Sequence, residues 1–353
     1  MSTLALPTVD EEIWRYSRIG ELELDSFKLG KLSTKVDASS AAKQIISSTT
    51  NVVSRTSTDI FEDLNGQHAQ LTAITTAKNQ VVAEPIVITH SLDESGVVAY
   101  SRLVVEANEN SEVTIVERFV SSADAKSLIV PVVDVRAAQS ARVTYVAINE
   151  LGAATWQIGY QQAVGQRDST MQMFTVALGG DYARMRAEVR LEGQGASAQQ
   201  VALYFADENQ MHDFRTLQDH AAPRTHSNLL FKGAVKDTAK SVYTGLIRIR
   251  ENATKSEAFQ TNRNLTLSNG AWAESVPNLE IETNDVKCSH ASTVGPIDEE
   301  QRFYLESRGI QPEIAERLVV LGFFDEVLNR LPALPFIAGL RERVSTKLLG
   351  AKS

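Results

Sequence analysis

Residues 236–288 repeat one short pattern, in which a polar turn is followed by small or β-branched residues. The four copies are Lys236-Asp237-Thr238-Ala239-Lys240-Ser241, Glu251-Asn252-Ala253-Thr254-Lys255-Ser256, Asn269-Gly270-Ala271-Trp272-Ala273 and Asn284-Asp285-Val286-Lys287-Cys288. The steps from Lys240 to Lys255, Trp272 and Lys287 are 15, 17 and 15 residues. A fixed period of short β segments is typical of a solenoid, in which each coil pairs only with its neighbours. The pattern therefore predicts a β-helix.

The chain before residue 236 shows the same alternation of polar turns and β segments. Polar turns near Asn110, Gln139, Gln166 and Gly195 recur at steps of 29, 27 and 29 residues, about twice the downstream step. Between such turns lie β-branched, aromatic or alternating runs, at 86–89, 113–119, 141–148, 171–178 and 242–249. No long amphipathic helix separates these runs, which argues against βαβ units. A sandwich of irregular hairpins is the alternative, but it would not favour so regular a step.

Small inward residues fit the narrow interior of such a coil, and the segments on either side of it differ in character. We expect a mainly β protein with a parallel β-helix core at 86–295. An N-terminal cap at 1–85 has short helical signals at 9–16, 39–48 and 59–65. A small helical domain at 296–353 has a helix opening at 298–301, a second from Pro312, a third piece at 323–331 and an amphipathic tail at 337–349. One open end of the coil would be covered by the cap, and the end near Cys288 could pair with another chain.

Composition narrows the function classes. The chain has 353 residues and a net charge of −9, which disfavours binding to nucleic acid or to an anionic membrane surface. Its single cysteine excludes an internal disulfide and an all-cysteine cluster site within one chain. The first residues lack the pattern of a signal peptide, and no apolar run approaches the length of a membrane span. We expect a cytoplasmic protein.

Cys288 and His290 are two residues apart, so on an extended strand the thiol and the imidazole would lie on the same face. This is half of a metal site, because a tetrahedral site needs four protein ligands or three with an open position. From spacing alone, the competing interpretation is a buried cysteine and a hydrogen-bonded histidine, and that one is favoured. The stretch 212–226 also holds several histidines and aspartates, but Ala221-Ala222-Pro223 interrupts any common face and a solvated loop is expected there.

The C-terminal third of the chain carries an ordered series of motifs. They are Asn262-Arg263-Asn264-Leu265, Pro277-Asn278-Leu279-Glu280-Ile281, Asn284-Asp285-Val286-Lys287-Cys288-Ser289-His290, Val294-Gly295 and Phe303-Tyr304-Leu305-Glu306-Ser307-Arg308-Gly309-Ile310. Over these roughly fifty residues the chain resembles the SufB/SufD family of iron–sulfur cluster assembly scaffolds, and within it the SufD type. A weaker similarity covers the rest of the chain, including Glu12-Ile13-Trp14-Arg15-Tyr16.

The resemblance implies a right-handed parallel β-helix and a shared site. In the family, a SufD histidine at the position of His290 faces a SufB cysteine at the heterodimer interface, and Cys288 occupies a position shared by SufD-type chains. SufB-type chains carry a cysteine where Asn262 stands here and a glutamate where Ala291 stands. With neither group present, this chain looks like half of a site that would hold iron or a nascent iron–sulfur cluster together with the partner.

The resemblance also implies partners. A SufB-like chain would pair through the strand edge near 285–295, and a SufC-like ABC ATPase would dock on the helices within 298–330. Because the chain has no phosphate-binding loop of its own, nucleotide hydrolysis must come from that partner. The resemblance leaves open a flavin bound by the complex and a homodimer of the isolated chain.

The function predicted from the sequence is therefore a scaffold subunit and not an enzyme. A homodimeric adaptor that binds the ATPase and no metal is one alternative, since the chain has no complete ligand set. A β-helix enzyme acting on polysaccharides is another, but aromatic residues make up only 7% of the chain, and paired carboxylates do not recur on successive repeats.

Overall fold

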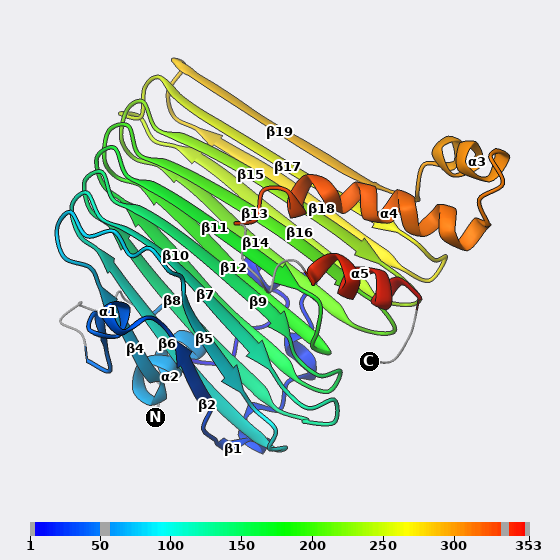
Figure 1. The fold of residues 1–353 in the computed structure, drawn as a ribbon, viewed down its shortest axis with the longest axis horizontal. Helices are drawn as coiled ribbons and strands as arrows, with labels where there is room; N and C mark the ends of the chain where they lie inside the picture. Colours follow the sequence, from blue (N-terminus) through cyan, green and yellow to red (C-terminus); the bar gives the residue numbers. More distant parts are fainter. Residues whose placement is uncertain (1–3, 50–56, 333–338, 350–353) are drawn as a thin grey trace.

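The chain winds through two facing β-sheets in the computed structural model, which describes residues 4–49, 57–332 and 339–349. Figure 1 shows the coils stacked from the N-terminal end to β19. One sheet has ten strands, in the order β18-β16-β14-β12-β10-β8-β6-β4-β3 with β1 beside β6, and the other has nine, in the order β19-β17-β15-β13-β11-β9-β7-β5-β2. The protein is mainly β, and its parallel solenoid has about 8 turns. The predicted β-helix is confirmed.

The chain alternates between the two sheets at every strand. The ten-stranded sheet contains β1 (Lys28–Leu29), β3 (Ile46–Ser47), β4 (Gln70–Thr75), β6 (Val97–Ala107), β8 (Leu128–Ala137), β10 (Trp156–Gly165), β12 (Tyr182–Leu191), β14 (Met211–His220), β16 (Lys240–Ile249) and β18 (Trp272–Ile281). The nine-stranded sheet contains β2 (Ser33–Asp37), β5 (Ile86–Ser91), β7 (Glu112–Val120), β9 (Arg142–Glu150), β11 (Thr170–Ala177), β13 (Ser197–Ala206), β15 (His226–Val235), β17 (Ser256–Thr266) and β19 (Val286–Gly295). The strand pairs are parallel except β2 with β5 and β3 with β4.

The sequence period corresponds to half a coil. Tyr182 pairs with Met211 on the next strand of the same sheet, and Lys240 pairs with Trp272. A full coil therefore takes about twice the 15-residue step, because the chain crosses to the other sheet and returns. The corner that leads from the ten-stranded to the nine-stranded sheet repeats the same backbone conformation, with φ between 54° and 62° at Asn79, Asn110, Ser140, Asp168, Arg224 and Lys255. This left-handed conformation favours Asn, Asp and Gly, which explains the polar composition of the turns.

The interior of the solenoid combines apolar clusters with buried polar networks. Inward side chains of the early coils form a largely aliphatic cluster, which includes Ile88 and Val143. The same coils bury Glu117, which binds His90 at 2.9 Å and accepts from the Tyr145 hydroxyl at 2.6 Å. The later coils also place hydrogen-bonded polar side chains inside, among them Tyr204, His220 and Asn264.

The N-terminal segment covers part of the ten-stranded sheet. It contains three single 3-10 turns (Glu12–Trp14, Ile19–Glu21 and Leu24–Ser26), α1 (Ser40–Lys43) and α2 (Ile60–His68). The helix expected at 59–65 is confirmed, with Asp59 as its N-cap. At 9–16 and 39–48 only one short turn and one four-residue helix form. Trp14 packs over the guanidinium of Arg184, at 4.0 Å from Cζ to the ring centroid.

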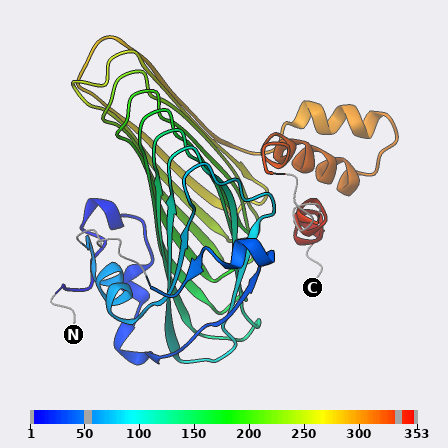
Figure 2. The same cartoon turned by 60° about the vertical axis from the view of Figure 1, so that its left-hand side comes forward.

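Three helices follow β19 in the described part of the chain, and two of them cover the nine-stranded sheet. They are α3 (Glu299–Ser307), α4 (Pro312–Leu328) and α5 (Leu340–Leu349). Val320 and Phe324 of α4 and Val344 of α5 pack against outward residues of that sheet, such as Phe205. Figure 2 shows these helices on one side of the solenoid and the N-terminal elements on the other. The separate helical piece expected at 323–331 is wrong, because α4 runs without a break to Leu328.

The domain bounds at 85 and 295 remain predictions. The solenoid strands that form the core begin at Ile86 with β5, and α3 begins four residues after β19 ends. However, β4 already pairs in parallel with β6. The boundary at residue 85 therefore stays a prediction, because β4 before it is already part of the parallel sheet.

Pro131 interrupts the ladder in the middle of a central strand, where a proline has no N–H to donate. The ladder with β10 is interrupted at this point, whereas the ladder with β6 is continuous. On the β6 side, the buried side chain of Asn65 on α2 donates from Nδ2 to the carbonyl oxygens of Ser101 and Val130, both at 2.8 Å. Gly159 faces the proline from β10, and a Cβ there would lie 3.0 Å from the proline ring. The helix α2 is thus fastened to the ten-stranded sheet by two buried hydrogen bonds beside the proline.

We expect Asn65→Ala to lower the free energy of unfolding by about 2–3 kcal/mol, because two buried hydrogen bonds between α2 and the sheet are lost. Chemical denaturation followed by circular dichroism measures this. Gln67→Ala, on the exposed side of the same helix, is the control and should change stability by less than about 0.5 kcal/mol. Equal effects of the two substitutions would contradict this role of Asn65.

Candidate functional site: the open end of the solenoid

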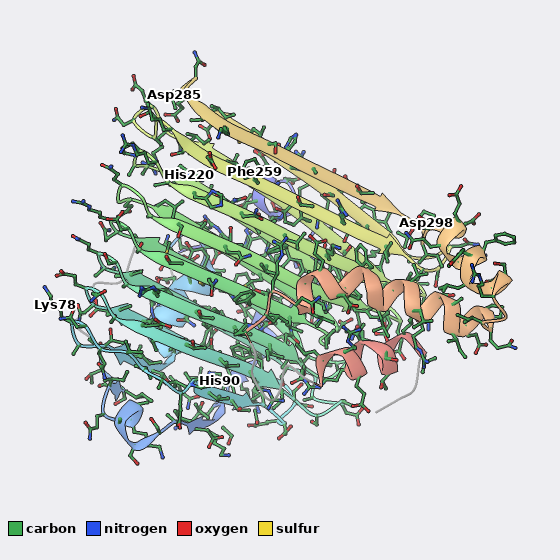
Figure 3. The ribbon with its side chains drawn as sticks, turned by 45° about the horizontal axis from the view of Figure 1, so that its top comes forward. Lys78, His90, His220, Phe259, Asp285 and Asp298 are labelled. Carbon is green, nitrogen blue, oxygen red and sulfur yellow. The ribbon has the colours of Figure 1, made fainter. Side chains whose placement is uncertain are left out.

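The last coil of the solenoid has two strand edges without a neighbour among the described residues. β19 pairs only with β17, and β18 pairs only with β16. Figure 3 labels Asp285 and Asp298 at the two ends of β19, which is the outermost strand. Ser292 Oγ donates to Ser275 Oγ at 2.7 Å and joins the two edge strands. The backbone edges of this coil are therefore available for pairing.

Cys288 and His290 both lie on β19, as the sequence predicts. Their register partners on β17 are Ala258 and Gln260, which are buried inward residues, so both side chains belong to the inner face of the end coil. The strand and the shared face are confirmed. Their role in binding metal stays a prediction.

The two side chains differ in environment. Cys288 is half-buried and packs against the cluster of Ile247, Ile249, Ala253 and Ala258. This burial raises the pKa of the Cys288 thiol, because the thiolate would lose solvation. His290 is exposed. The packing favours a structural contribution from the cysteine and leaves the imidazole open to a ligand.

Asn262, two positions from Gln260 on β17, belongs to a closed hydrogen-bond network. Its Nδ2 donates to Tyr204 Oη at 2.9 Å and to the Phe231 carbonyl oxygen at 3.2 Å. Asn264 Nδ2 donates to Asn262 Oδ1 at 2.8 Å, and Tyr204 donates to Asn264 Oδ1 at 2.6 Å. These bonds satisfy the amides in the interior, so Asn262 is a structural residue here.

No group of three or more His, Cys, Asp or Glu side chains that could hold a metal ion exists among the residues that the structure describes. Cys288 and His290 are thus two ligands of an incomplete set. An iron centre at this place requires ligands from another molecule.

The solvated loop expected around His212–His226 is wrong. His212, Asp213, Asp219 and His220 all lie on β14 and are buried. Strand alternation places the two histidines inside the coil and the two aspartates outside, where Asp213 pairs with Arg184 and Asp219 pairs with Arg250. These residues form no metal cluster.

His220, labelled in Figure 3, is held between two hydroxyl groups. Nδ1 lies 2.7 Å from Thr225 Oγ1, and Nε2 lies 2.7 Å from Ser227 Oγ. Gln218 Nε2 donates to Ser227 Oγ at 2.6 Å, which leaves the serine proton for His220 Nε2. Burial lowers the pKa of His220 to about 4, so the ring is neutral and structural at neutral pH.

Among the described residues, no helix is long and apolar enough to cross a membrane.

Comparison with known proteins bears directly on this end coil. Residues 90–323 match the family model described as the SufBD core domain of the SUF system for FeS cluster assembly, which is more than half of the chain. This chain belongs to the SufB/SufD family. Within the family it is of the SufD type.

The relatives support this assignment. An iron–sulfur cluster assembly SufBD family protein of Mycobacterium tuberculosis is 40% identical over 285 residues, which are 78% of this chain and 70% of that protein. SufD of Escherichia coli is 29% identical over 295 residues, covering 82% of this chain and 69% of that protein. SufD of Bacillus subtilis is 30% identical over 257 residues, covering 72% of this chain and 59% of that protein. As a member of this family, the SufD-type chain is an iron–sulfur cluster assembly protein. The descriptions of these relatives give no support to the flavin.

Two features of this region were not predicted from the sequence, namely the place of Gln260 and the burial of His220. Gln260 gives no signal in a linear sequence, because only the register places it beside His290. The buried state of His220 could have been inferred from the alternation of β14, since the charged residues Asp213, Arg215 and Asp219 occupy the opposite face.

A pH dependence follows from the half-buried thiol. Because burial raises the pKa of Cys288, a smaller fraction of thiolate is present at pH 8 than in an unfolded peptide. We expect alkylation by iodoacetamide in the native chain to be slower than in the urea-unfolded chain, and its rate to keep rising with pH above 9. As Cys288 is the only cysteine, mass spectrometry follows it without interference. A native rate equal to the unfolded rate at pH 8 would exclude this environment.

Proposed function

We propose that the chain is a SufD-like scaffold subunit that pairs with a SufB-like chain and binds a SufC-like ABC ATPase. The observation that supports it best is the open last coil, where exposed His290 lies on the inner face of a strand with an unpaired edge. A second β-helix can add its own edge strands there through backbone hydrogen bonds. The two interiors would then face each other, with His290 between them.

The cluster or its iron is the cargo of this interface. His290 would supply a nitrogen ligand, and the partner would supply the remaining ligands, including a thiolate. Cys288 belongs to the proposed site as a neighbour of the cargo. Its packing against Ile247 and Ala258 supports a role in shaping the site more than direct ligation. The chain itself would act as a scaffold without catalysing a reaction of its own.

The ATPase would dock on the helical region within 298–330. Large apolar side chains are exposed there, with Phe303 71%, Tyr304 57% and Leu318 44% exposed. An open cleft of about 1110 Å³ lies beside them, between α3, α4 and the outward side chains of Lys232 and Arg263. Exposed apolar side chains beside a cleft are typical of a protein interface.

The role of the nucleotide would be conformational. The helices α4 and α5 are attached to the nine-stranded sheet that ends in β19. Movement of a docked ATPase could therefore be transmitted to the end coil through a rigid sheet. In this mechanism the nucleotide state of the partner selects between two arrangements of the heterodimer, one closed and one open for cluster assembly.

The metal role of His290 is tested by anaerobic co-purification with SufB-like and SufC-like partners. We expect His290→Ala to leave the complex intact and to lower its iron and acid-labile sulfide content several-fold, because a ligand is lost from the interface. His226→Ala is the control, since His226 is also exposed and lies on the same sheet. Unchanged iron and sulfide in the His290 variant would exclude the metal role, and the absence of any complex in the wild type would exclude the heterodimer.

The docking surface is tested with two leucines of similar exposure. Leu318→Asp on α4 should reduce co-purification of the ATPase by more than about tenfold while the SufB-like chain is retained, because a buried charge at an interface costs several kcal/mol. Leu349→Asp on α5 is the control, as Leu349 is 55% exposed and lies outside 298–330. Pull-down with a tagged ATPase measures both. Equal binding by the two variants would contradict the assignment of this surface.

A further inference from the structure

Gln260 is a buried amide with no hydrogen bond. Its side chain points into the solenoid from β17, and the residue is 2% exposed. Neither Oε1 nor Nε2 has a partner among the residues that the structure describes. A buried polar group without a hydrogen-bond partner lowers the free energy of unfolding by about 1–3 kcal/mol. The presence of two such atoms in one amide therefore needs an explanation.

The opposite sheet leaves space for this amide. A Cβ at Gly245 on β16 would lie 2.6 Å from Gln260 Nε2 and 2.7 Å from Oε1, so the amide occupies the space that this glycine leaves. The same Cβ would lie 2.3 Å from the hydroxyl of Tyr243, which already pairs with Thr216 at 2.9 Å. The amide is thus accommodated across the interior without being hydrogen-bonded by it.

The neighbour of Gln260 toward the open end is His290, its register partner on β19. Side chains at register positions of adjacent strands lie on the same face, and the strands are about 4.8 Å apart. The other inward residues of β17 offer His290 nothing comparable. Ala258 has no polar side chain, and Asn262 and Asn264 are hydrogen-bonded to each other and to Tyr204.

We propose that Gln260 is a positioning residue for His290. Its Oε1 accepts the proton of one imidazole nitrogen, which fixes the neutral tautomer and directs the lone pair of the other nitrogen outward to the cargo. A histidine that binds a metal almost always donates its second N–H to such an acceptor, and removing the acceptor weakens metal binding about 10–100-fold. This inference rests on the proposed function of His290.

The tautomer of His290 tests the inference without any metal. The full chain, labelled with ¹⁵N-histidine, is examined by NMR at pH 8, and the His290 signals are identified by their loss in His290→Ala. We expect one tautomer in the wild type and in Gln260→Glu, which keeps an acceptor. In Gln260→Met, which keeps the length and removes the acceptor, we expect the mixture of tautomers found in a solvent-exposed histidine side chain.

Gln200→Met is the matched control. Gln200 is buried, has an unpartnered Oε1 and stands in the same inward column two coils below Gln260, on β13. It should leave the His290 signals unchanged. Identical His290 signals in the wild type and in Gln260→Met would overturn the inference, and so would an equal change caused by Gln200→Met. Thermal unfolding followed by circular dichroism verifies that each variant is folded.

Iron binding separates this inference from the proposed function. In the complex titrated anaerobically with Fe²⁺, Gln260→Met should bind iron at least about tenfold more weakly than the wild type, and Gln200→Met should not. Loss of iron in His290→Ala with an unchanged tautomer in Gln260→Met would overturn the positioning role alone. Unchanged iron in both His290→Ala and Gln260→Met, with a changed tautomer in Gln260→Met, would overturn the metal role of His290 and leave the contact between the two side chains standing.

Discussion

Parallel pairing of each coil with the next is the interaction on which the structure depends. Because the register is kept over many coils, every inward position becomes a column of side chains, and every strand between the ends has its backbone groups paired on both sides. Nothing in this repeated pairing limits the number of coils. At the N-terminal end antiparallel β2 and β3 terminate the sheets. At the other end β18 and β19 leave their edges open.

Polar side chains are buried in the interior of the stack from the early coils to the open end. Aliphatic side chains surround the network of His90, Glu117 and Tyr145 in the early coils, and amides, hydroxyls and imidazoles are frequent in the later ones. Polar groups in a dry interior restrict the structure, because each must find a partner with the right geometry. Tyr204, Asn262 and Asn264 satisfy one another, and His220 is satisfied by two hydroxyls. The unpartnered amide of Gln260 stands out against these networks, directly beside the histidine of the family motif.

The coverings of the two sheets keep the end coil free. The N-terminal segment binds to the outside of the ten-stranded sheet through Asn65 and Arg184, and α4 and α5 bind to the outside of the nine-stranded one. Tyr16 of the N-terminal segment lies against Trp272 at the start of β18, but the backbone edges of β18 and β19 have no further strand partner among the described residues. This arrangement is compatible with the proposed pairing of the last coil with a second chain.

The sequence by itself determined that the fold is a solenoid, because the length of each repeat appears directly in the spacing of turns and small residues. It also placed Cys288 and His290 on one face of a strand, since alternation in a strand is a local property. The tertiary structure alone decided which polar residues are buried, as with His212 and His220, and that α4 is continuous past Phe323. It also decided that Gln260 stands beside His290, thirty residues away in the chain. Such proximity depends on the register between coils, which is a non-local property that no single stretch of sequence contains.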